Sequence, residues 1–81
     1  MAVETDKVEA VLRQHWKIPA DLSSAVFHDM AFRIQVMVGQ KYSHDNLKYQ
    51  LHLIQTKDLR QEIDDPSCDQ IASALLGNSR A

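Results

Sequence analysis

The sequence contains few of the residues that interrupt regular structure or cross-link a small domain. Its 81 residues include two glycines, two prolines and one cysteine. Sparse glycine and proline favour a few long helices, because a chain of short strands needs frequent turns. The single thiol of Cys68 excludes an intrachain disulfide and suits a reducing compartment. The hydrophobic content of 44% is ordinary for a globular protein, so a packed core is expected.

Long apolar runs and a basic excess are also missing. No segment approaches the roughly 18 apolar residues that cross a bilayer, and the N-terminus lacks the basic start and apolar stretch of a signal peptide. We therefore expect no membrane partner and a cytoplasmic location. The net charge of −2 argues against nucleic-acid binding, which draws on lysine and arginine at phosphates. Residues 1–81 are expected to form a single domain, with 78–81 as a flexible tail.

Helical periodicity accounts for most of the apolar residues. The spacing predicts helices over 6–16, 20–38, 43–64 and 67–77. The apolar residues of the third helix drift around its axis, which indicates either contact with more than one neighbour or a bend near residues 56–57. The residues that can begin the first, third and last of these helices are Asp6 with Glu9, Ser43 or Asp45, and Ser67 with Gln70. Gly77 can end the last helix through its backbone conformation. We predict an all-α fold, a compact bundle of three to four helices. Its expected core comprises Trp16, Phe27, Met30, Ile34, Leu51, Ile54, Ile71 and Leu75.

Two segments also fit a second pattern. Residues 31–38 and 47–53 alternate apolar and polar side chains, as half-buried strands do. An α+β alternative keeps the first and last helices and pairs these two segments as a hairpin. The connecting residues 39–46 are long for a hairpin and lack a tight turn dipeptide. The helical interpretation is therefore favoured, and the hairpin stays open as the alternative.

The second predicted helix is apolar on two sides. Ala25, Phe32 and Val36 lie together, away from its main apolar arc, and the apolar residues of the third helix drift round to Tyr49 and Leu53. Exposed apolar ridges of this kind commonly mark interfaces. We therefore expect a protein-interaction module, such as an adaptor, chaperone-like subunit or regulator. These five residues would bind another protein chain, or a second copy in a homodimer.

Residues with catalytic or metal-binding chemistry form no recognisable pattern. No two of the four histidines have the i,i+3 or i,i+4 spacing of a metal-binding helix. The acidic residues around Cys68 disfavour its thiolate, so an inert thiol is expected. The sequence therefore predicts no enzyme, no catalytic residue, no metal and no cofactor. A redox or metal-linked role of Cys68 and the histidines is the weaker of two functional alternatives.

The other alternative is a small DNA-binding transcriptional regulator. Residues 71–79 resemble the Ile-Ala-x-x-Leu-Gly-x-Ser start of a helix-turn-helix, with one residue too many between Ala72 and Gly77. A recognition helix would have to follow, and the sequence ends at Ala81. The basic face that this function needs would draw on Arg13, Arg33, Lys41 and Lys48.

Overall fold

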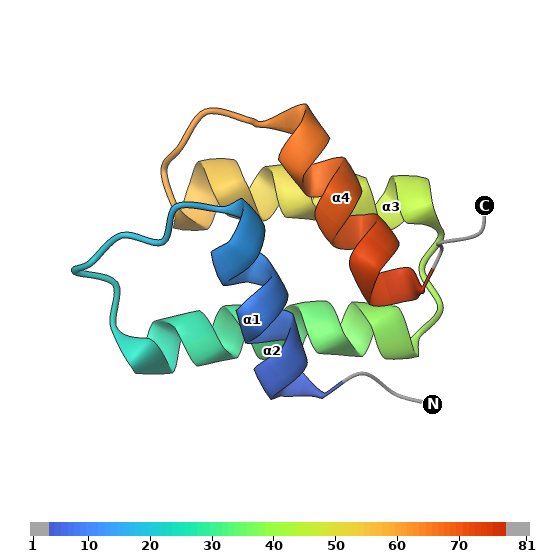
Figure 1. Ribbon diagram of the computed structural model, residues 1–81, viewed down its shortest axis with the longest axis horizontal. Coiled ribbons are helices and arrows are strands. Elements are labelled where there is room, and N and C mark those ends of the chain that lie inside the picture. Colours follow the sequence, from blue (N-terminus) through green and yellow to red (C-terminus); the bar gives the residue numbers. More distant parts are fainter. Residues whose placement is uncertain (1–3, 78–81) are drawn as a thin grey trace.

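The computed structural model describes residues 4–77, which form four α-helices and one π-helical turn (Figure 1). The elements are α1 (Thr5–His15), α2 (Ser24–Gly39), α3 (His44–Leu53), the π turn η1 (Ile54–Asp58) and α4 (Asp65–Leu76). Residues 31–38 and 47–53 lie within α2 and α3, and residues 4–77 contain no strand. The all-α prediction is confirmed and the hairpin alternative is wrong. The expected tail, 78–81, lies outside the described residues.

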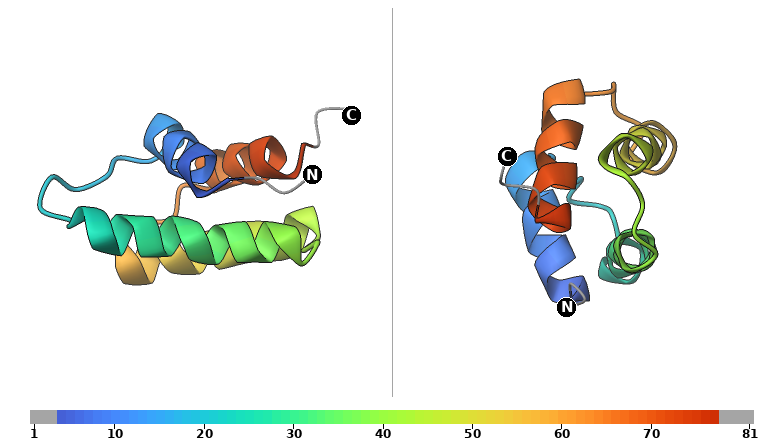
Figure 2. Two further views of the ribbon diagram at one scale, coloured as in Figure 1. Left: turned by 90° about the horizontal axis from the view of Figure 1, so that it is seen from below. Right: turned by 90° about the vertical axis from the view of Figure 1, so that its right-hand side faces the viewer.

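The helices are arranged in two layers. α2 and α3 run side by side in one layer, and α1 and α4 lie across them in the other (Figure 2). α1 packs on α2, α4 packs on α3, and α1 also contacts α4. Within residues 4–77, no element covers the side of the α2–α3 layer that faces away from α1 and α4.

The start of α1 differs from its prediction. Asp6 was expected to cap the helix, but the helix begins at Thr5, and Glu4 occupies the cap position without a side-chain hydrogen bond. Asp6 instead lies in the first turn, where its charge interacts favourably with the positive end of the helix dipole. The helix ends as expected: the Trp16 N–H donates to Leu12 O at 2.8 Å, and Pro19 follows.

α2 begins four residues later than predicted. Ser23 Oγ accepts a hydrogen bond from the Val26 N–H at 3.1 Å and caps the helix. Residues 20–22 form a turn instead, in which the Leu22 N–H donates to Pro19 O. The helix continues through Gly39, and Lys41 then adopts a positive φ of 62° that reverses the chain toward α3.

Ser43, one of the two predicted caps, begins α3, with the Asn46 N–H donating to its Oγ at 3.2 Å, and Asp45 lies in the first turn. The expected continuation to residue 64 is wrong, because the helix widens into η1 and stops at Asp58. Thr56 lies at the centre of this change, and its Oγ1 donates to the carbonyls of His52 and Leu53. Side-chain donors of this kind loosen a helix, which is consistent with the π-helical turn at residues 54–58.

The cap of α4 is Asp64, and the prediction of Ser67 is wrong. Asp64 accepts from both the N–H and the hydroxyl of Ser67, at 3.3 and 2.9 Å. Pro66 consequently lies inside the first turn, where its missing N–H costs nothing. Gly77 closes the helix with φ 67°, as expected from the sequence.

One core occupies the space between the two layers. All eight predicted core residues are buried. The core also holds residues that the prediction omitted, namely Val8, Val11, Leu12, Ala31, Leu47, Leu59, Cys68 and Ala72.

Candidate functional site

The outer side of α2 carries an apolar stripe. Ala25, Phe32 and Val36 are all exposed, and 51% of the surface of Phe32 and 40% of that of Val36 is accessible. The buried residues Phe27, Met30, Ala31 and Ile34 lie on the opposite side of the same helix. Burying a large apolar side chain that is exposed to water is worth about 2 kcal/mol. Covering Phe32 and Val36 would therefore be favourable.

The two residues predicted on α3 differ in their exposure. Tyr49 is 59% exposed and lies opposite the buried Leu47 and Leu51. Leu53, one turn further along, is half-buried. We use the name "outer face" for Ala25, Phe32 and Val36 of α2 together with Tyr49 of α3. α2 and α3 share one layer (Figure 2), and each of the four residues is exposed on the side of its helix opposite the buried residues.

Two further exposed apolar residues were not predicted. Val26, in the first turn of α2, is 48% exposed. Ile63 lies in the non-helical segment between η1 and α4 and is 51% exposed, whereas Leu59, at the start of that segment, is buried. Neither exposure carries a sequence signal, because both depend on which elements become neighbours.

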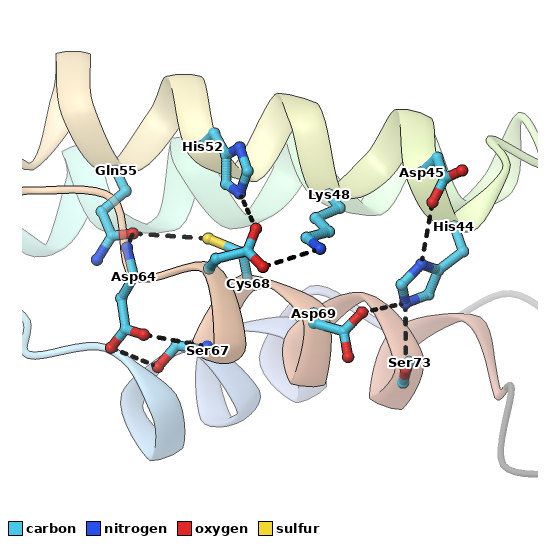
Figure 3. A network of polar contacts seen from close by, with 11 residues as sticks. His44, Asp45, Lys48, His52, Gln55, Asp64, Ser67, Cys68, Asp69 and Ser73 are labelled. Atoms are coloured by element: carbon cyan, nitrogen blue, oxygen red, sulfur yellow. Dashed lines mark hydrogen bonds and ion pairs between the residues drawn. The ribbon is translucent and has the colours of Figure 1, made fainter.

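A polar ladder joins α3 to α4 on the other side of α3 (Figure 3). Residues spaced four apart on α3 meet residues spaced four apart on α4: His44, Lys48 and His52 face Asp65, Asp69 and Ser73. The i,i+4,i+8 spacing of both sets is visible in the sequence and could have predicted this pairing.

Lys48 and Asp65 form the central pair of the ladder. Lys48 Nζ lies 3.1 Å from Asp65 Oδ2, and His52 Nε2 lies 3.0 Å from Asp65 Oδ1. The hydrogen bond from Lys48 lowers the pKa of Asp65, and the same bond raises the pKa of Lys48. Each group therefore favours the charged form of the other.

His44 and Ser73 are close enough to suggest a nucleophile and its base, since Ser73 Oγ lies 3.2 Å from His44 Nε2. A base of this kind needs a third group that orients it through its other nitrogen. Asp69 instead lies 3.2 Å from the same Nε2, and Asp45 is 3.8 Å from Nδ1 and exposed. The cluster therefore connects two helices and does not have the order of a catalytic triad.

Cys68 lies within the core beside the ladder. Its side chain is fully buried, and its Sγ lies 3.5 Å from Gln55 Oε1 (Figure 3). Burial, with a smaller contribution from Asp64 and Asp65, raises the pKa of the thiol to about 11. The nearby indole N–H of Trp16 opposes this rise without forming a hydrogen bond to the sulfur. The thiol is thus protonated and shielded at neutral pH, as the sequence predicted.

The residues of the two functional alternatives are not brought together. Among residues 4–77, no group of three or more histidine, cysteine, aspartate or glutamate side chains could hold a metal ion. Of the basic residues, Arg33 pairs with Asp58, and Arg13 stacks on the Phe27 ring. Of the segment that resembles a helix-turn-helix, residues 71–77 form the second half of α4 and its cap, and the apolar side of α4 is buried, whereas residues 78 and 79 lie outside the described residues.

Two further findings bear on function. In the described part of the chain, none of the helices combines the length and apolarity needed to pass through a bilayer. Comparison with known proteins finds no family model, no curated protein and no solved structure that matches this chain.

Proposed function

We propose that this protein is an interaction module that works by binding another protein chain through the outer face. The observation that carries the proposal is the 51% exposure of Phe32 at the centre of an apolar stripe. An aromatic side chain with apolar neighbours on the same helix is the kind of residue that dominates binding energy at interfaces. An adaptor or regulator needs no chemistry beyond such a surface. The lone, buried thiol is compatible with the cytoplasm as its location.

One charged residue lies within the apolar stripe, and another lies beside it. Asp29 lies between Ala25 and Phe32 along the helix, with its side chain largely exposed. Arg33 is also partly exposed and reaches Asp58 at 3.3 Å. Charged groups next to apolar side chains occur at protein interfaces, and these charges influence which partner binds.

A matched pair of variants tests the proposal. Phe32→Asp places a charge in the outer face, whereas Ile63→Asp places one at an equally exposed apolar position in the segment before α4. Each tagged protein is recovered from the cells in which it is made, and bound proteins are quantified by mass spectrometry. We expect at least a tenfold loss of the bound chain with Phe32→Asp and retention with Ile63→Asp.

Circular dichroism of both variants provides the control for folding. Both should keep the helical spectrum of the wild type, because both side chains are half outside the core. Identical recovery of bound protein with Phe32→Asp and wild type would contradict the proposal. Loss of the helical spectrum in Phe32→Asp would place Phe32 in the core and would contradict it as well.

A further inference from the structure

The outer side of α2 has the spacing of a helix-pairing seam. Ala25, Asp29, Phe32 and Val36 follow one another at intervals of four, three and four residues, and all four are exposed. Intervals of three and four are those of the a and d positions at which two helices pack together. α2 has 16 residues and is therefore about 24 Å long, which is enough for an extended helix pair.

We propose, building on the function proposed above, that the chain bound at the outer face is a second copy of this protein. The two copies of α2 pair antiparallel around a two-fold axis. Along the helix, this axis crosses at the level of residues 30 and 31, on the exposed side opposite those two buried residues. In this register Ala25 lies opposite Val36 of the second copy, and Asp29 lies opposite its Phe32. The pairing is isologous, so every contact occurs twice.

The argument for a second copy is that the seam is complementary to itself. The smallest member, Ala25, meets the branched Val36, so that the layer at each end of the pairing combines a small side chain with a larger one. Layers of this composition let helices approach closely without leaving a void. A parallel pairing would instead place Ala25 opposite Ala25 and Phe32 opposite Phe32.

Charges on the seam are complementary under the same two-fold operation. Asp29 lies within one residue of the level of Arg33 of the second copy, so each carboxylate gains a guanidinium partner across the axis. Arg33 is 3.9 Å from Asp29 and 3.3 Å from Asp58 within its own chain. An antiparallel pair therefore surrounds each arginine with carboxylates, and a parallel pair would place the two Asp29 side chains against each other.

Light scattering across a range of micromolar concentrations gives the first test. We expect the mass to rise from the 9.2 kDa of one chain to twice that value with increasing concentration. Phe32→Asp should weaken the association at least tenfold, and Ile63→Asp should leave it unchanged. A mass that stays at one chain throughout, or a dimer insensitive to Phe32→Asp, would overturn the inference.

Disulfide cross-linking tests the register. An equimolar mixture of Ala25→Cys and Val36→Cys, oxidised with glutathione disulfide, should give a cross-linked heterodimer. Neither variant alone should cross-link, because equivalent positions would be 11 residues apart along the helices, or about 16 Å. A mixture of Ile63→Cys and Val36→Cys serves as the matched control, and the buried Cys68 should not react. Cross-linking of Ala25→Cys with itself would overturn the antiparallel register.

The two proposals can fail separately. A protein that remains a single chain, yet loses a captured partner with Phe32→Asp, overturns the second copy and leaves the interaction module standing. A single chain with the same captured proteins in wild type and Phe32→Asp overturns both.

Discussion

Gln55 Oε1 accepts a hydrogen bond from the backbone N–H of Asp64 at 3.0 Å, and this bond holds the start of η1 against the start of α4 (Figure 3). Gln55 is the one polar residue among the buried residues described. Its amide Nε2 donates to Gln61 Oε1, and the Gln61 N–H donates to Gln55 O. A buried amide is stable only when its hydrogen bonds are satisfied, so the path of residues 59–64 follows from this side chain.

Replacing Gln55 with leucine should destabilise the fold. The substitution keeps the volume but leaves the Asp64 N–H without its acceptor, which costs about 1–3 kcal/mol of unfolding free energy. Gln50→Leu, at a half-buried position on α3, provides the control and should change stability by less than about 0.5 kcal/mol. Urea denaturation followed by circular dichroism measures both. Equal stability of the two variants would show that the Gln55 hydrogen bonds contribute nothing.

Lys41→Gly should stabilise the protein. Lys41 has a φ of 62°, a conformation that costs a residue with a Cβ about 1–2 kcal/mol. Glycine removes that cost and offsets part of the gain through its greater freedom in the unfolded chain, which leaves about 0.5–1 kcal/mol. Gln40→Gly, at a φ of −85°, should lower stability instead. Thermal denaturation of both variants checks the difference in sign.

The Cys68 thiol should react only when the protein unfolds. With a pKa of about 11 it is almost entirely protonated at pH 8, and its side chain is fully buried. Labelling with Ellman's reagent should be slow in buffer and immediate in denaturing urea. Ala74→Cys, at an exposed position on α4, should gain one rapidly labelled thiol. Rapid labelling of Cys68 in the native wild type would contradict its burial.

The contribution of the Lys48–Asp65 pair should depend on pH at both extremes. The lowered pKa of Asp65 adds stability above the ordinary aspartate pKa of about 3.9, and this is lost as the pH falls through the lowered value. The raised pKa of Lys48 adds stability below about 10.4, and this is lost as the pH rises through the raised value. The stability difference between wild type and Lys48→Met should therefore be flat from about pH 5 to 9 and shrink outside that range.

Lys7→Met serves as the control for that experiment, because Lys7 is exposed on α1 and away from the ladder. Its difference from wild type should be small throughout. A Lys48→Met difference that persists unchanged at pH 2 would show that Lys48 stabilises the protein through its methylene chain and not through Asp65.

The predicted helix boundaries were correct where a single local interaction decides them. Ser43, one of the two candidate caps, begins α3, and Gly77 ends α4 as expected, since each acts on the neighbouring backbone alone. The predicted start of α4 at Ser67 was wrong, because Asp64 caps the helix three residues earlier and Pro66 is tolerated within the first turn. Residues 59–64 could not be predicted, because their path depends on hydrogen bonds to Gln55.

The sequence by itself determined the helical class, the eight predicted core residues and the apolar stripe opposite the core side of α2. These features follow from the 3.6-residue period of the helix, which places residues on one side or the other wherever the helix lies. The tertiary structure alone decided that Val26 and Ile63 are exposed while Leu59 and Cys68 are buried. Exposure at those positions depends on which helix covers them, and the layering of α1 and α4 across α2 and α3 arises from contacts between residues far apart in the chain.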